Sequence, residues 1–255
     1  MTTHFFGDTA VLTGRSLKHI TRSLDTIITT AITPIALMLL FVYVLGGAIK
    51  AGPGPYVTYL LPGILLITIA SGIAYTAYRL FLDLQGGIFE RFNSMPIARS
   101  SVLWAHVLTS LVANLISLVV VVLVALVMGF RSSAGLLSWL AVAGILVLFI
   151  LALTWLAVIP GLTAKTIDGA SAFSYPLIFL PFVSSAFVPT ATMPGPVRWF
   201  AENQPFTPII ETLRGLLFGT PIGNSGVIAV AWCVAISVLG FLWARRLYER
   251  DPAHR

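Results

Sequence analysis

Six long stretches without a charged side chain constrain this chain more than any other feature of its sequence. No Asp, Glu, Lys or Arg occurs within residues 26–49, 51–78, 100–130, 132–164, 169–197 and 215–244. A helix needs about 20 mostly apolar residues to cross the hydrocarbon core of a bilayer, at roughly 1.5 Å per residue. Each stretch is therefore long enough for one membrane-spanning helix and too short for two.

The sequence predicts an all-α membrane protein with six transmembrane helices. The expected cores of these spans are Thr29–Val44, Leu60–Tyr78, Val107–Gly129, Leu136–Ile159, Phe173–Val188 and Val227–Trp243. Transmembrane β-strands alternate apolar and polar residues over about 9–11 positions, and these stretches do not alternate. Any one stretch could be a buried helix of a large soluble protein, but six in succession favour the membrane.

The overall composition excludes a soluble enzyme. Charged residues make up only 9% of the 255 residues and hydrophobic residues 58%, whereas a soluble domain carries about 25% charged residues. The single cysteine, Cys233, excludes an intramolecular disulfide framework and a cysteine-based metal cluster. We expect one transmembrane domain over residues 1–255, with a cytoplasmic amphipathic helix at 1–25, the spans at 26–244 and a cytoplasmic tail at 245–255.

The positive charges in the loops predict the orientation. With six spans, both termini lie on one side, and that side carries eleven of the 15 Lys and Arg residues. An excess of Lys and Arg marks cytoplasmic loops, so both termini are expected in the cytoplasm. The net charge of +6 therefore reflects the orientation of the chain in the membrane. No basic patch is interleaved with aromatic residues in a soluble segment, which argues against nucleic-acid binding.

The segment before the first span has the pattern of an amphipathic helix. At about 100° per residue, its basic face carries Arg15, Lys18, His19 and Arg22, opposite an apolar face. Such a helix lies in the membrane interface. It could anchor the topology only, or it could also form part of a docking surface.

The cytoplasmic connection between the second and third spans is the most informative loop. Gly86 and Gly87 end the helix that leaves the second span, and Pro96 disfavours helical angles at Met95. Between these breakers the residues are expected to form a short helix with an apolar and a charged face, parallel to the membrane. A connecting loop would not need exposed Phe, Met and Ile side chains, so a protein-binding surface is favoured over a plain loop.

The segment between residues 190 and 214 is expected outside the cytoplasm. It is too charged for a span and too apolar for a free loop, and two short helices in the outer leaflet would satisfy both facts. Pro208 after Thr207 indicates a helix start, and Glu211 can pair with Arg214 on one face. Gly215 and Gly219 match the spacing of a small-residue helix contact.

The chain lacks the patterns of the common catalytic and cofactor sites. None of its three lysines follows a glycine, so it has no phosphate-binding Gly-Lys-Ser/Thr motif, and protease and metal-ligand motifs are missing as well. In the third stretch we interpret His106 as an interfacial histidine rather than a proton relay. Asn114 is interpreted as a helix-contact hydrogen bonder rather than a ligand site. Spans without an embedded charge argue against proton- or sodium-coupled transport, and indicate a partner-driven transporter or a passive pore.

Two segments carry a resemblance to a known family. One is Gly87-Ile-Phe-Glu-Arg-Phe-Asn-Ser-Met-Pro-Ile-Ala-Arg99; the other runs from Phe182 to Pro205 and continues through Thr207-Pro208 to Leu213-Arg214. The chain resembles the ABC-2 type transport permeases, and within them the daunorubicin-resistance-like drug exporters. The six-span layout fits this family along essentially the whole chain.

The resemblance implies roles for three segments. A cytoplasmic coupling helix between spans two and three would dock in the ATPase through Gly87, Phe89, Glu90, Arg91, Phe92, Asn93, Met95, Pro96, Ile97 and Arg99. The N-terminal helix with Arg15, Lys18, His19 and Arg22 would be the family's interface helix. Extracytoplasmic re-entrant helices between spans five and six would include Pro194, Arg198, Trp199, Glu202, Asn203, Pro205, Pro208, Glu211 and Arg214.

The resemblance also implies the partners. A separate ABC ATPase dimer would bind ATP and Mg, so the permease chain itself would need no cofactor and catalyse nothing. A second permease, identical or a sibling, would complete an exporter of lipophilic drugs, natural products or lipids in a bacterial plasma membrane. Two other classes stay open from the residues alone: a non-transporting scaffold of a membrane complex, and a channel.

Overall fold

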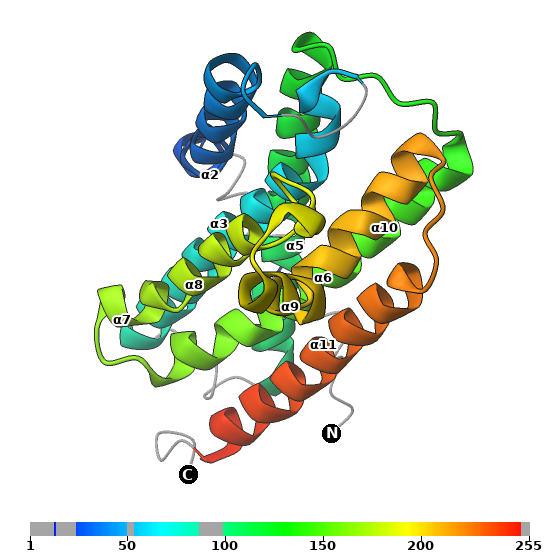
Figure 1. Cartoon of the computed structure of the whole chain (residues 1–255). Helices are drawn as coiled ribbons and strands as arrows, with labels where there is room; N and C mark the ends of the chain where they lie inside the picture. Colours follow the sequence, from blue (N-terminus) through cyan, green and yellow to red (C-terminus); the bar gives the residue numbers. More distant parts are fainter. Residues whose placement is uncertain (1–12, 14–23, 50–53, 87–98, 251–255) are drawn as a thin grey trace.

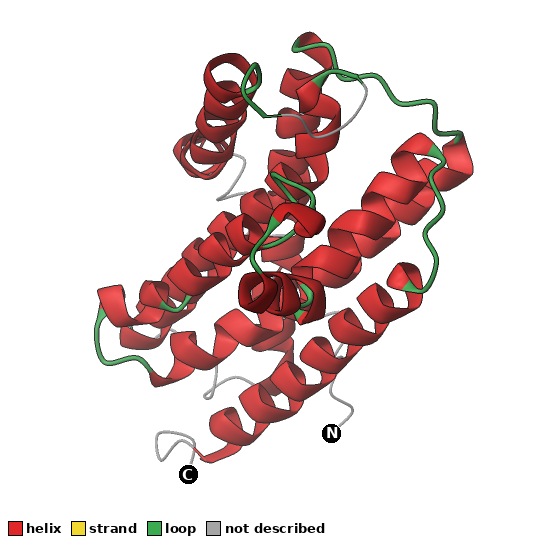
Figure 2. Cartoon of the chain, viewed as in Figure 1, coloured by secondary structure: helices red, strands yellow, loops and turns green. Residues whose placement is uncertain are grey.

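The computed structural model describes residue 13 and residues 24–49, 54–86 and 99–250. In this part of the chain every regular element is a helix and no strand occurs (Figure 2). The prediction of an all-α protein is therefore confirmed for the described residues.

Among the described residues, four helices are long and apolar enough to cross a membrane: α3 (Tyr56–Gln85), α5 (Arg99–Val127), α6 (Leu136–Thr163) and α11 (Ser225–Arg250). They coincide with the second, third, fourth and sixth predicted spans. The prediction of the third span is too long at its end, because the helix stops at Val127. Gly129 has a left-handed φ of 98° that a continuing helix cannot contain.

The first and fifth predicted spans fall on shorter apolar helices. The first comprises α2 (Leu24–Leu39) and the π-helical η1 (Leu40–Leu45). The fifth is divided into α7 (Ile167–Ala172), α8 (Ser174–Phe179) and the 3-10 helix η2 (Leu180–Val183). Pro176 lies in the first turn of α8 and Pro181 in the first turn of η2, where a missing backbone N–H costs no hydrogen bond within the helix. The predicted single helix over Phe173–Val188 is thus replaced by short pieces that end at Val183.

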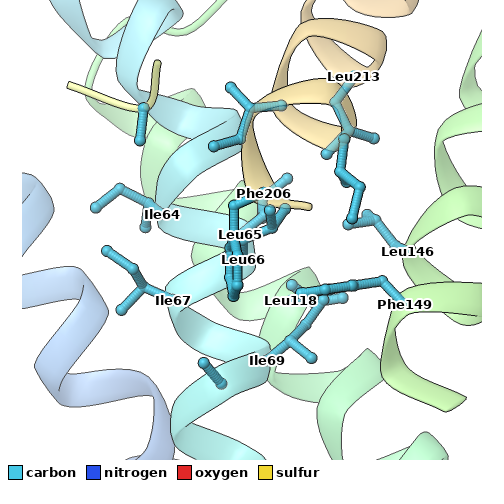
Figure 3. Close-up of a cluster of buried hydrophobic side chains, with 14 of the residues drawn as sticks. Ile64, Leu65, Leu66, Ile67, Ile69, Leu118, Leu146, Phe149, Phe206 and Leu213 are labelled. Carbon is cyan, nitrogen blue, oxygen red and sulfur yellow. The ribbon is translucent and has the colours of Figure 1, made fainter. Parts of the chain in front are cut away.

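Helix α3 forms the centre of the bundle. It contacts α2, α5, α6, α7, α8 and α10, and buried residues occur on all its sides, as expected for a helix surrounded by protein. Figure 3 shows Ile64, Leu65, Leu66, Ile67 and Ile69 of α3 beside Leu118 of α5, Leu146 and Phe149 of α6, and Phe206 and Leu213 of α10. Helix α11 lies at the periphery and exposes many large apolar side chains, which suits contact with lipid.

The remaining helices follow η2. The 3-10 turn η3 (Thr190–Thr192) leads into α9 (Gly195–Asn203), and α10 (Phe206–Phe218) follows and lies alongside α6 (Figure 1). Helix α10 ends at Gly219, whose φ of 69° is the left-handed conformation typical of helix C-termini. Gly215 lies against Ile222, beyond this turn. An added Cβ at Gly215 would meet Thr220 and Ile222 of the following loop, and Gly219 terminates the helix, so the predicted helix contact of the two glycines is not found among the described residues.

Candidate functional site

Two of the three predicted functional segments lie outside the described residues. These are the N-terminal basic residues Arg15, Lys18, His19 and Arg22, and the coupling segment from Gly87 to Ile97. Of the coupling residues, Arg99 falls within the described part, as the first residue of α5. The third segment, from Pro194 to Arg214, is described completely.

The two segments predicted to act on opposite membrane sides meet α3 at opposite ends: residues 87–98 follow its C-terminal end, and Arg214 contacts Tyr59 near its N-terminal end. At one end Asp83 lies 3.3 Å from His106 of α5, next to the connection that contains residues 87–98. At the other end Tyr59 contacts Arg214 of α10. The 24 residue steps from Tyr59 to Asp83 span about 36 Å of helix, slightly more than the roughly 30 Å hydrocarbon core.

Helix α9 is exposed, and an ion pair joins two of its side chains that lie one turn apart. It begins after Pro194, and Arg198 Nε donates to Glu202 Oε1 at 2.8 Å. Thr190 of η3 donates to the same oxygen at 3.1 Å. These hydrogen bonds, that from Arg198 above all, lower the pKa of Glu202. The exposed Trp199 ring lies on this helix, as an interfacial anchor would.

The corner between α9 and α10 is held by side-chain amides. Asn203 Nδ2 donates to the carbonyl of Trp199 at 2.8 Å. The buried Gln204 accepts a hydrogen bond from the Phe206 N–H at 3.3 Å and donates to the Val183 carbonyl at 3.2 Å. Pro205 occupies the N-cap position of α10. Gln204 was not among the predicted site residues, although its position between two helices, next to Pro205, was an available signal.

The predicted start of α10 is correct to within two residues. The helix begins at Phe206, which places Pro208 in the first turn, where its missing N–H costs nothing. Thr207 does not cap the helix; its hydroxyl oxygen accepts a hydrogen bond from the Ser185 N–H at 3.3 Å. Phe206 packs edge-on against Phe149 at 5.3 Å between ring centroids, near the middle of α6. Helix α10 therefore starts deep in the bundle and runs outward.

Arg214 joins three parts of the fold at this end. Its guanidinium donates to Glu211 Oε1 at 2.6 Å, to the Tyr59 carbonyl at 3.1 Å and to the Ser185 carbonyl at 3.0 Å. Its central carbon lies 3.8 Å from the centroid of the Tyr59 ring, a close cation–π contact. The predicted pair of Glu211 and Arg214 is confirmed. Tyr59 and Ser185 were missed, because nothing in their local sequence indicates a contact so distant along the chain.

A second polar cluster lies inside the bundle. Ser110 of α5 bonds to Thr76 of α3 at 2.6 Å and approaches Thr154 of α6 at 3.4 Å. Asn114 Nδ2 donates to the Ser110 carbonyl at 2.9 Å, while its Oδ1 lies against Gly72 of α3 and finds no hydrogen-bond partner among the described residues. The placement of Asn114 at a helix contact is thus correct, but the hydrogen bonds between helices are made by Ser110.

These arrangements hold helices together and contain no reacting group. The described residues hold no group of three His, Cys, Asp or Glu side chains that could bind a metal. Long apolar helices, a short helix that enters the bundle from one end, and hydrogen-bonded clusters at their crossings are features of a multi-pass membrane protein.

Comparison with known proteins supplies the family. Residues 8–218 match the ABC-2 type transporter family, and the chain belongs to it. The chain is accordingly a membrane permease subunit of an ABC transporter and has no catalytic role of its own.

Two relatives extend the similarity over nearly the whole chain. The daunorubicin resistance ABC transporter permease protein DrrB1 of Streptomyces coeruleorubidus is 27% identical over 89% of this chain and 81% of its own length. The probable doxorubicin resistance ABC transporter permease protein DrrC of Mycobacterium tuberculosis is 26% identical over 98% of this chain and 91% of its own length. The resemblance inferred from the two sequence segments is confirmed.

Proposed function

We propose that this chain is the permease of an exporter that moves a lipophilic drug, natural product or lipid out of the cytoplasm or the inner leaflet. The observation that carries the proposal is the family match together with relatives named for daunorubicin and doxorubicin resistance. The apolar surface of the bundle supports a lipophilic substrate, since α5 and α11 expose many large hydrophobic side chains.

In this proposal a separate ABC ATPase dimer binds ATP and Mg and drives two permeases, either identical or a sibling pair. The coupling segment, defined as residues 87–99, docks in the ATPase, and the basic N-terminal helix lies at the cytoplasmic interface. Both ends of the chain are cytoplasmic, in a bacterial plasma membrane. The placement of the ends of α3 supports this division, because residues 87–98 follow one end and Arg214 contacts the other.

The pieces α7, α8 and η2 complete the fifth crossing, and α2 with η1 the first. The 17 residues from Ile167 to Val183 extend about 26 Å when helical. This number of residues is at the lower end of the range of known transmembrane helices. Helices α9 and α10 are then the extracytoplasmic re-entrant segment. The contact of Phe206 with Phe149 near the middle of α6 supports an entry of α10 into the outer leaflet.

Cysteine labelling tests this topology directly. Cys233 is the single cysteine, so the Cys233→Ser chain provides a clean background. Lys165→Cys and Ala191→Cys flank the proposed fifth crossing, and both positions are exposed. A membrane-impermeant maleimide should label Ala191→Cys in intact cells and Lys165→Cys only after permeabilisation. Labelling of both from the same side would contradict a fifth crossing.

The transport proposal is tested in proteoliposomes that contain the chain with its copurified ATPase. Glu90→Ala and Arg91→Ala should lower ATP-dependent substrate movement and substrate-stimulated ATP hydrolysis without lowering expression. Lys165→Ala is the matched control, since it removes an exposed charge on the same proposed side but outside the coupling segment. Unchanged transport in both coupling variants would contradict the docking role. Failure to copurify any ATPase, under conditions that preserve a known ABC complex, would favour a scaffold.

A further inference from the structure

A groove of about 610 Å³ runs between α6 and α11 on the outer surface of the bundle. Its lining residues are Leu156 and Ile159 of α6 and Ile236, Leu239, Gly240, Leu242, Trp243, Arg246 and Leu247 of α11. The two helices run side by side and end at the same end of the molecule (Figure 1). The groove belongs to neither the α9–α10 segment nor the polar cluster around Ser110.

The floor of the groove is fixed by a close approach of the two helices. Gly240 lies against the backbone of Trp155, where an added Cβ would come within 3.1 Å of the Trp155 Cβ. Trp155 also packs edge-on against Phe241 at 4.9 Å between ring centroids. The helices thus touch along this line, and the longer side chains on either side form the walls of a preformed groove.

The chemistry of the groove changes along its length. From Ile236 to Leu242 its walls are apolar. At the end nearest the C-terminus it carries Trp243, which is 60% exposed, and then the exposed Arg246. No hydrogen bond or ion pair holds the Arg246 guanidinium within the part of the chain that the structure describes. An exposed Trp followed by a cation is the order of side chains found at a membrane–water interface.

The length of the groove fits one leaflet. The ten residue steps from Ile236 to Arg246 correspond to about 15 Å of helix, which is half of the roughly 30 Å hydrocarbon core. An acyl chain that begins at the level of Arg246 would therefore reach the bilayer centre at Ile236. A cation at the headgroup level complements a phosphate, and basic pockets between membrane helices bind anionic headgroups.

We propose that this groove binds one anionic phospholipid of the leaflet on the side where α11 ends, with an acyl chain between α6 and α11 and the phosphate at Arg246. The lipid is a bound component of the permease and not its cargo. The inference does not depend on what the protein exports, because it requires only that α6 and α11 cross the membrane.

Native mass spectrometry of the full chain in mild detergent tests the proposal with two probes that differ only in headgroup charge, dioleoylphosphatidylglycerol and dioleoylphosphatidylcholine. The wild type should bind one phosphatidylglycerol about fivefold more tightly than phosphatidylcholine, the factor expected for one Arg near a headgroup. Arg246→Gln should abolish that preference. Arg245→Gln is the matched control, because it removes the same charge at the neighbouring position, which does not line the groove. This variant should keep the preference for phosphatidylglycerol.

A second pair of variants tests the groove itself. Leu239→Trp fills it and should weaken the binding of both lipids at least fivefold. Val238→Trp places the same ring on an exposed position outside the lining and should not. The proposal is overturned if Arg246→Gln keeps the preference, if Arg245→Gln loses it equally, or if Leu239→Trp binds lipid normally. It is also overturned if Leu239→Trp changes the oligomeric state, which would make a second copy the occupant, or if inorganic phosphate displaces the lipid, which would indicate a simple anion site.

Discussion

The hydroxyl oxygens of Thr76 and Ser110 lie 2.6 Å apart at the buried contact between α3 and α5. Since Ser110 also approaches Thr154 of α6, one hydroxyl joins three helices. Hydrogen bonds between membrane helices contribute about 0.6 kcal/mol on average and up to about 1.7 kcal/mol. We predict that Ser110→Ala lowers the free energy of unfolding by about 1–2 kcal/mol, measured by denaturant-induced unfolding in mild detergent.

The control for this measurement is Ser133→Ala, which removes an exposed hydroxyl in the loop between α5 and α6. It should leave the unfolding free energy unchanged. Equal effects of the two substitutions would mean that the buried cluster has no special importance for the stability of the bundle.

Gly72 permits the close approach of α3 to Asn114. An added Cβ at Gly72 would overlap the Asn114 side chain, so Gly72→Ala must displace Asn114 or separate the helices. We predict a loss of about 1–3 kcal/mol in unfolding free energy, the usual cost of overpacking. Gly144→Ala is the matched control, because Gly144 is also helical and has no atom within 4 Å of an added Cβ. That control should be neutral or slightly stabilising, since Ala favours helix more than Gly.

A double-mutant cycle checks the cause. If overlap with Asn114 is responsible, Gly72→Ala should cost less in an Asn114→Ala background than in the wild type. Equal costs in both backgrounds would assign the effect to the backbone of α3 instead.

Three helices were predictable in full from charge-free stretches, since the predicted cores of α3, α6 and α11 lie inside the observed helices. The fifth stretch is equally apolar, yet it is divided, with Pro176 and Pro181 in the first turns of α8 and η2. The presence of proline alone does not identify such a division, because α3 contains Pro62 and α6 contains Pro160. Charge counting finds membrane segments; it does not show whether each is one helix.

Side-chain contacts were predictable only at short range. Glu211 and Arg214 are three residues apart on one helix, so their pair follows from helix geometry. The contacts of Arg214 with Tyr59 and Ser185 cross 155 and 29 residues of chain, and only the packing of α10 against α3 and against the segment that follows η2 creates them. The same is true of Asp83 and His106, which meet because α3 and α5 are neighbours.

Arg214 should contribute more to stability than any exposed charge of the α9–α10 segment. Its side chain is only 12% exposed and makes three charge-assisted hydrogen bonds, each of which is worth about 1.5–3 kcal/mol when a charged group takes part. We predict that Arg214→Ala lowers the unfolding free energy by at least about 2 kcal/mol. Arg214→Lys should recover only part of this loss, because an ammonium group cannot reproduce the planar fork. Full recovery by Lys would show that the charge alone matters.

Glu202 should make the stability of the α9 helix depend on pH in one direction. Its pKa lies below the ordinary value of 4.5, chiefly because Arg198 donates a hydrogen bond to it. A carboxyl whose pKa is lowered by folding stabilises the folded state above its unfolded pKa, and the contribution disappears as the pH falls through the lowered value. The difference in melting temperature between the wild type and Glu202→Gln should therefore be constant from pH 7 to about 5 and shrink below about 4.5. Because the pair is exposed, 0.5 M salt should reduce the difference at pH 7. A difference that grows on acidification would show that the ion pair with Arg198 does not stabilise the fold.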